Sequence, residues 1–134
     1  MNGYAVDTNI ISFLMRGNLE LQKKIYREAN AVNGVIIPPI VYYEIKRGLK
    51  DHHASEKLAA FKRLCDMLGV GEIDIETLDK AADIYAELKK NGCLIEDSDI
   101  LIAAFCLAHD YVLITDNTRH FERIDGLRFV NWAK

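Results

Sequence analysis

The stretch that decides the fold is residues 97–116, DSDILIAAFCLAHDYVLITD. Residues 100–109 are apolar and long enough for a buried helix, and Asp97 or Ser98 is the expected N-cap. Residues 111–115 are apolar or β-branched, and they predict a buried strand that is followed directly by Asp116. A buried helix that leads into a buried strand is typical of an α/β fold.

The same alternation extends over the whole chain. Short apolar runs predict strands at residues 4–6, 35–37, 70–73, 111–115 and 127–130. Helical spacing of apolar residues predicts helices at 10–15, 19–31, 40–49, 55–68, 76–90 and 100–109, with a short turn or helix at 119–121. No repeat or linker interrupts the pattern. We therefore expect one α/β domain over residues 1–134, with a largely parallel sheet.

Composition excludes several classes of protein. The 134 residues are half apolar and carry a formal net charge of −3, so the chain as a whole is not a basic nucleic-acid binder. Its three cysteines are odd in number and form no Cys-x-x-Cys pair, which argues against a disulfide framework and favours a reducing cytoplasm. We also expect no signal peptide and no membrane span, because the apolar runs are too short.

Four acidic residues occupy corresponding places in this pattern. Asp7 and Asp116 each directly follow a predicted strand. Glu44 lies in the first turns of the helix after the second strand, and Asp99 opens the buried helix. Because parallel strands end at one edge of a sheet, where ligand sites form in open α/β folds, we expect these four acids to converge.

Converging carboxylates repel one another, and each raises the pKa of its neighbours. A cation relieves this repulsion, and an all-oxygen ligand set selects Mg²⁺ or Mn²⁺ over zinc. Such an ion binds one or two carboxylates together with substrate phosphate, and it activates water. The placement of the acids therefore predicts hydrolysis of a phosphodiester. Any one of them alone could instead cap a helix or favour a turn.

Asp97 and Asp99 need separate roles, because residues two apart on a helix point to different faces. Asp99 shares the face that Ile102, Ala103 and Cys106 mark as the core-facing stripe. We therefore assign Asp99 to the site and leave Asp97 as a cap or a supporting residue behind the metal ligands. The reverse assignment stays open as an alternative.

Four segments, in order, resemble the motifs of PIN domains. They are residues 5–9 (AVDTN), 39–48 (PIVYYEIKRG), 97–104 (DSDILIAA) and 113–121 (LITDNTRHF). The resemblance runs from Tyr4 to Trp132 and is greatest to VapC toxins of bacterial and archaeal toxin–antitoxin pairs. Residues 117–123 (NTRHFER) and the ending 126–132 look like the branch that cleaves initiator tRNA in the anticodon loop.

The resemblance implies a three-layer α/β/α sandwich with a central, mostly parallel sheet of about five strands. It also implies a cytoplasmic, metal-dependent endoribonuclease that cleaves structured RNA such as tRNA, forms a homodimer and is inhibited by a cognate VapB-like, DNA-binding antitoxin. Asp7, Glu44, Asp99 and Asp116 match the family's catalytic acids, and Asp7 with Asp99 would anchor Mg²⁺ or Mn²⁺. Some relatives carry Asn at the fourth place, where this chain has Asp116. The residues expected to orient carboxylates or waters are Thr8, Asn9, Asp97, Thr115 and Asn117.

Positive charge beside the acids would have to hold the RNA. The candidates adjoin Glu44 or Asp116 in sequence and are Lys46, Arg47, Lys50, Arg119 and Arg123, with His120 among them. Each could instead belong to a solvated face. Arg16 is expected to oppose a helix dipole, and Lys57 to lie on a solvated helix face.

Other functions stay open on the sequence alone. The same acids would serve a nuclease that acts on ribosomal RNA or single-stranded DNA. A phosphoacceptor receiver domain also places acids at strand ends, but it requires a lysine at the end of a late strand, where this chain has Thr115-Asp116. An inactive interaction module would leave the repulsion between four acids uncompensated.

Overall fold

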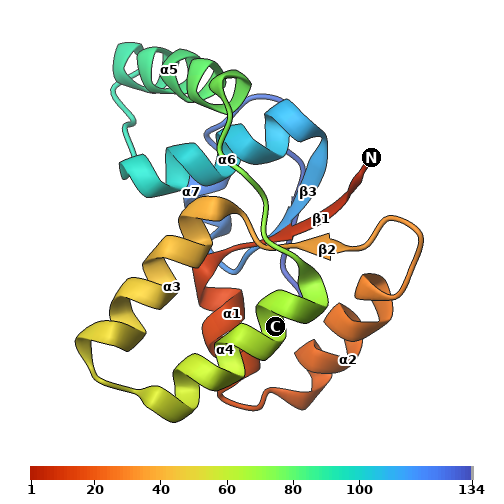
Figure 1. Cartoon of the computed structure of the whole chain (residues 1–134). Helices are drawn as coiled ribbons and strands as arrows, with labels where there is room; N and C mark the ends of the chain where they lie inside the picture. Colours follow the sequence, from red (N-terminus) through yellow and green to blue (C-terminus); the bar gives the residue numbers. More distant parts are fainter. Residues whose placement is uncertain (134) are drawn as a thin grey trace.

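The computed structural model describes residues 1–133, and its centre is a four-stranded sheet in the order β2-β1-β3-β4 (Figure 1). The strands are β1 (Gly3–Val6), β2 (Val35–Ile36), β3 (Tyr111–Ile114) and β4 (Phe129–Val130). All neighbouring pairs run parallel. The predicted α/β fold with a parallel sheet is therefore confirmed.

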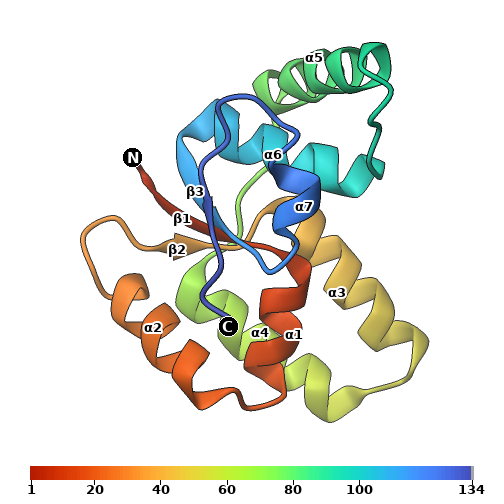
Figure 2. The ribbon, with the colours of Figure 1, turned by 180° about the vertical axis from the view of Figure 1, so that it is seen from behind.

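Helices cover both sides of the sheet. They are α1 (Thr8–Met15), α2 (Leu19–Ala29), α3 (Pro39–Asp51), α4 (Ser55–Leu68), α5 (Ile75–Lys90), α6 (Asp97–His109) and α7 (Thr118–Phe121). In both views α5 and α6 lie above the strands, and α1, α2 and α4 lie below them (Figures 1 and 2). Within residues 1–133, no helix combines the length and apolar character needed to cross a membrane.

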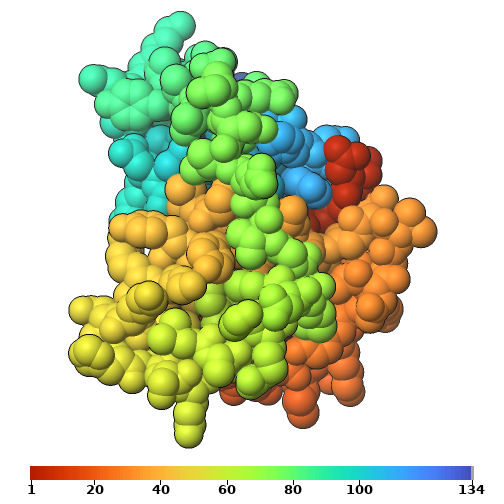
Figure 3. All heavy atoms as spheres, viewed as in Figure 1, coloured from red at the N-terminus to blue at the C-terminus, as the bar shows by residue number. Residues whose placement is uncertain are grey.

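The strand predicted at residues 70–73 is wrong, because only Val70 pairs, as a single bridge to Ile37. Two backbone hydrogen bonds make this bridge, from Ile37 N–H to the Gly69 carbonyl and from Gly71 N–H to the Ile37 carbonyl. The next residues after Ile37 are prolines, which have no N–H, so the ladder cannot continue. The segment that joins α4 to α5 then crosses the surface between these helices (Figure 3).

Several element boundaries also differ from expectation, among them the starts of α6 and β4. The N-cap of α6 is Glu96, so the predicted N-cap at Asp97 or Ser98 is wrong. Glu96 has an extended backbone, and its carbonyl accepts from Ile100 N–H, while its side chain makes no capping bond. β4 starts later than predicted, because Leu127 N–H is already engaged by the Ile124 carbonyl in a turn.

The strand register positions the site. Val6 of β1 and Ile114 of β3 are direct partners, and Asp7 N–H donates to the Ile114 carbonyl at 3.0 Å. Val6, Ile114 and the adjoining Ile10 are fully buried, and burying each such side chain stabilises the fold by roughly 1.5–3 kcal/mol. Asp7 and Thr115 directly follow these paired residues, so they lie next to each other at the carboxyl end of the sheet, beside fully buried apolar side chains.

Candidate active site

Asp7 is the buried centre of the site. Asp7 is only 5% exposed, and its carboxylate caps α1 by accepting from Thr8 N–H at 2.8 Å. Its other oxygen accepts from the Thr115 hydroxyl at 2.7 Å. Thr115 is itself held in place, because its hydroxyl oxygen accepts from Asn117 N–H at 2.9 Å. The ends of β1 and β3 are thus joined by side chains as well as by the sheet.

Burial raises the pKa of Asp7 from 3.8 to about 6. The hydrogen bonds from Thr115 and Thr8 act in the opposite direction, and the negative charges of Asp99 and Asp116 add to the rise. Ionising this carboxylate therefore costs more free energy than ionising an exposed aspartate. A nearby cation would relieve the cost.

Glu44 and Asp116 are joined to the same centre through the two residues that follow Asp7. The Thr8 hydroxyl donates to Glu44 Oε1 at 2.8 Å, which fixes the α3 side chain against the start of α1. Asn9 Nδ2 donates to Asp116 Oδ1 at 3.1 Å. Residues 7–9 thus contact acids from both α3 and the end of β3.

Asp99 is held by α7. Its carboxylate lies 2.9 Å from His120 Nδ1 and is 15% exposed. Asn117 Nδ2 lies 2.9 Å from the same ring nitrogen. An ionised Asp99 can only accept, so Nδ1 must carry the hydrogen in that state. His120 therefore orients Asp99, although its place in the sequence suggested only phosphate contact.

A cavity of about 280 Å³ lies between these side chains. Its lining residues are Asp7, Thr8, Asn9, Glu44, Glu96, Ser98, Asp99, Asn117 and His120. Asp116 does not line it and reaches it only through Asn9. Asp97 is exposed outside it, whereas Glu96 and Ser98, which the sequence interpretation did not assign, are inside. Asp97 and Asp99 lie about 200° apart around α6, so the two side chains cannot both face the cavity.

Comparison with known proteins identifies this arrangement. Residues 4–127 match the PIN domain family. The chain belongs to that family. Within it, the PIN domain is 36% identical over 98 residues to Ribonuclease VapC1 of Methanocaldococcus jannaschii, covering 73% of this chain and 70% of that protein. The predicted kinship with the VapC-type branch is therefore confirmed.

Two matches that cover nearly the full length of both chains support the same family assignment. The tRNA(fMet)-specific endonuclease VapC of Shigella flexneri is 23% identical over 133 residues, covering 97% of this chain and 98% of that protein. A chain of the DNA-bound VapBC structure from Salmonella typhimurium superposes with a TM-score of 0.90 at 25% identity, covering 99% and 100% of the two chains. The likeness therefore extends over the whole fold.

The PIN domain's cavity offers oxygen atoms from Asp7, Glu44, Asp99 and Glu96, a donor set that fits a hard divalent cation. Within residues 1–133, ligand atoms of three or more acidic, His or Cys side chains come within 4.8 Å of one another only at Asp74, Glu76 and His109. The cavity acids are more widely spaced, which leaves room for the waters that Mg²⁺ retains.

The Asp74, Glu76 and His109 group lies at the other end of α6 from Asp99. Asp74 caps α5 by accepting from Thr77 N–H, and His109 pairs with Asp74 at 3.0 Å. Capping and pairing therefore account for this group.

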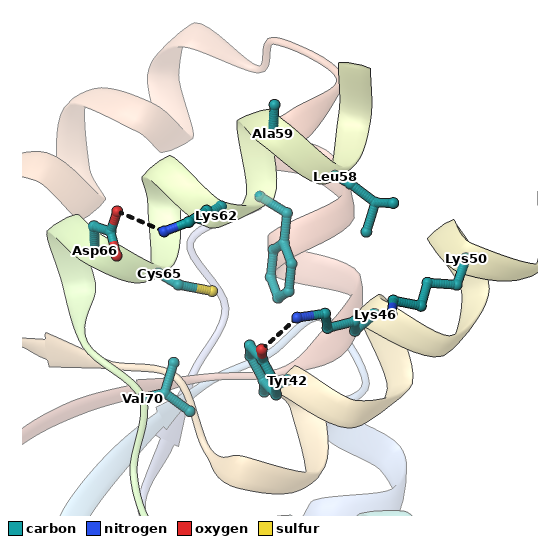
Figure 4. A pocket seen from close by; sticks show the side chains of 10 residues that line it. Tyr42, Lys46, Lys50, Leu58, Ala59, Lys62, Cys65, Asp66 and Val70 are labelled. Atoms are coloured by element: carbon teal, nitrogen blue, oxygen red, sulfur yellow. Dashed lines mark hydrogen bonds and ion pairs between the residues drawn. The ribbon is translucent and has the colours of Figure 1, made fainter. Parts of the chain in front are cut away.

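The basic residues predicted to bind RNA do not gather at the cavity. Lys46 and Lys50 line a different hollow between α3 and α4, where Lys46 Nζ donates to the Tyr42 hydroxyl at 2.8 Å (Figure 4). Arg47 stacks over the Tyr43 ring, and Arg123 donates to the Cys93 carbonyl. The remaining member of the predicted set, Arg119, is exposed on α7.

Proposed function

We propose that this PIN domain is a metal-dependent endoribonuclease and the toxin of a toxin–antitoxin pair. The observation that carries the proposal is the cavity at the carboxyl ends of β1 and β3, where Asp7, Glu44 and Asp99 converge. Carboxylate oxygens in this arrangement suit a divalent cation such as Mg²⁺ or Mn²⁺. The VapC ribonucleases that the chain matches support hydrolysis of RNA.

Asp7 and Asp99 are the proposed metal ligands, and Glu44 and Asp116 complete the cluster through waters or by orienting the attacking water. When bound, Mg²⁺ or Mn²⁺ would supply Lewis-acid polarisation of the phosphate and make a water more acidic. The chain's own contribution is positioning: Thr115 and Thr8 N–H hold Asp7, while His120 holds Asp99. The Thr8 hydroxyl and Asn9 hold Glu44 and Asp116.

The proposed substrate is structured RNA in the cytoplasm, with tRNA, and initiator tRNA within it, as the favoured class. Support comes from the Shigella flexneri relative, which is named for cleavage of tRNA(fMet), and from the motif resemblance of residues 117–123. Ribosomal RNA and single-stranded DNA are the alternative substrates that an assay must separate from tRNA.

The proposed partners are a cognate VapB-like antitoxin and a second copy of this chain. Matched structures of VapBC from Salmonella typhimurium and from other bacteria support the antitoxin. Co-expression with a candidate VapB-like antitoxin, followed by light scattering of the purified complex and of the free toxin, tests both assemblies.

One assay tests the activity. The purified, antitoxin-free protein is incubated with a tRNA pool, ribosomal RNA or single-stranded DNA, with Mg²⁺, Mn²⁺ or EDTA, and the new ends are mapped. Asp99→Asn is compared with Asp97→Asn, which removes the same charge two residues away outside the cavity. We expect metal-dependent tRNA cleavage that Asp99→Asn abolishes and Asp97→Asn preserves.

Each other result has a defined meaning. Absence of cleavage by the folded protein with every substrate and both metals contradicts the nuclease. Cleavage of ribosomal RNA or DNA in preference to tRNA keeps the site but replaces the substrate. Equal activity of the two variants removes Asp99 from the site.

A further inference from the structure

A second hollow adjoins the acidic cavity. It has a volume of about 350 Å³ and lies between α1 and α3. Its lining residues are Thr8, Ser12, Met15, Arg16, Glu44, Ile45, Gly48, Leu49, His52 and Lys57. We call it the α1–α3 groove. It shares Thr8 and Glu44 with the acidic cavity, and the 2.8 Å hydrogen bond between these two side chains forms the boundary.

The charge changes sign along this path. The acidic cavity is lined by Asp7, Glu44, Glu96 and Asp99, so by itself it repels a polyanion. The far end of the α1–α3 groove carries Arg16, Lys57 and His52. In the part of the chain that the structure describes, Arg16 and Lys57 form no salt bridge, and both are exposed. The Arg16 guanidinium lies 5.9 Å from the centroid of the Phe13 ring, a contact with an uncharged group. Their positive charge is available to an incoming phosphate.

The other basic hollow is a poorer candidate for the same role. The hollow between α3 and α4, with Lys46, Lys50 and Lys62, shares no lining residue with the acidic cavity. Lys46 is engaged by Tyr42, and Lys62 pairs with Asp66 at 3.9 Å (Figure 4). The α1–α3 groove is therefore the basic surface that continues directly from the acids.

Gly48 adds an independent observation. It lies inside α3, where glycine is less favourable than alanine. A Cβ built there would have no atom within 4 Å, so packing does not require the glycine. The absence of a side chain at this position instead leaves space in the groove that a larger residue would fill.

From these observations we propose that the α1–α3 groove holds the RNA strand on one side of the cleaved phosphodiester, with Arg16 and Lys57 as phosphate-positioning residues and His52 beside them. The proposal rests on the proposed nuclease function and specifies how its site receives a polyanion. It also assigns a role to Arg16, which the sequence analysis placed at a helix end, and to Lys57, which it placed on a solvated helix face.

The first test is binding, which does not depend on cleavage. A tRNA pool is titrated in EDTA at several salt concentrations into the wild type, Arg16→Ala/Lys57→Ala and a control, Lys62→Ala. Lys62 lies on α4, as Lys57 does, but in the other hollow. We expect the double variant to bind about tenfold more weakly and to lower the slope of log K against log salt by about 1.4, which is two contacts at about 0.7 each. Lys62→Ala should match the wild type.

The second test is kinetic. Arg16→Ala/Lys57→Ala should raise KM with little change in kcat, because the cations position RNA and do not touch the reacting atoms. Gly48→Gln, which fills the groove, should also raise KM, with a Tm at or above that of the wild type. A Tm for the double variant within a few degrees of the wild type excludes misfolding.

The outcomes separate the two proposals. RNA binding and salt slope that are unchanged in Arg16→Ala/Lys57→Ala overturn the groove even when the wild type cleaves RNA. Failure of the wild type to bind RNA also overturns the groove. Binding that depends on Arg16 and Lys57, without cleavage under any metal, supports the groove and contradicts the nuclease.

Discussion

The Thr115 hydroxyl donates a 2.7 Å hydrogen bond to the Asp7 carboxylate, joining residues that are 108 positions apart. Both residues directly follow strands that pair through Val6 and Ile114. The contact is buried, and it lowers the pKa of Asp7 against the larger effect of burial. It is therefore the clearest link between the sheet and the proposed chemistry.

Thr115→Val should destabilise the fold and weaken metal binding. It removes the partner of Asp7 Oδ2 and of the N–H of Asn117, at a cost of about 1–3 kcal/mol in the free energy of unfolding, while Asp7 Oδ1 keeps its hydrogen bond from Thr8 N–H. Thr115→Ser retains the hydroxyl and should lie closer to the wild type. Urea unfolding at neutral pH in EDTA measures the difference. Equal stability of the Val and Ser variants would show that the hydrogen bond contributes nothing.

The stability that Asp7 contributes to the metal-free protein should fall as the pH rises from 4 to 7. The pKa of Asp7 is about 6 in the fold against 3.8 ordinarily, so the folded state binds this proton more tightly than the unfolded chain does. The resulting stability is fully present below the unfolded pKa and is lost as the pH rises through the folded pKa. Its total size is about 3 kcal/mol.

Asp7→Asn isolates this contribution. The difference in unfolding free energy between the wild type and Asp7→Asn, from urea titrations in EDTA, should change by about 2.4 kcal/mol between pH 4 and pH 7. Asp97→Asn, an exposed acid, serves as the comparison. Parallel curves for the wild type and Asp7→Asn would contradict a raised pKa at Asp7.

His120→Ala should lower the affinity for Mn²⁺ by about 10- to 100-fold, because Asp99 loses the residue that orients it. Titration calorimetry measures this affinity directly. The control is His109→Ala, which removes an imidazole paired with Asp74 at the other end of α6. A larger loss in His109→Ala than in His120→Ala would place the cation at the Asp74, Glu76 and His109 group instead.

Glu44→Gln should reduce cleavage by at least about 100-fold, as expected when charge stabilisation worth several kcal/mol is removed from a metal-assisted reaction. Folding should be preserved, because the amide oxygen can still accept from the Thr8 hydroxyl. Single-turnover cleavage and a thermal melt provide the two readings. Activity within a few-fold of the wild type would remove Glu44 from the proposed machinery.

The sequence by itself determined the α/β class, the parallel sheet and the placing of acids at one edge. These follow from local rules, because apolar periodicity distinguishes strand from helix and parallel strands share a carboxyl edge. Asp7 and Asp99 could be placed at that edge because each is tied to the boundary of a strongly apolar element, β1 or α6.

Tertiary structure alone decided which side chains around the acids share a cavity. Glu96, the N-cap of α6, and Ser98 line the cavity together with Asp99, while Asp97 is exposed outside it. The strand expected at residues 70–73 is reduced to one bridge because its partner runs into prolines. His120, Arg16 and Lys57 reach their neighbours only through the packing of α7, α1 and α4, contacts between distant segments that no local pattern records.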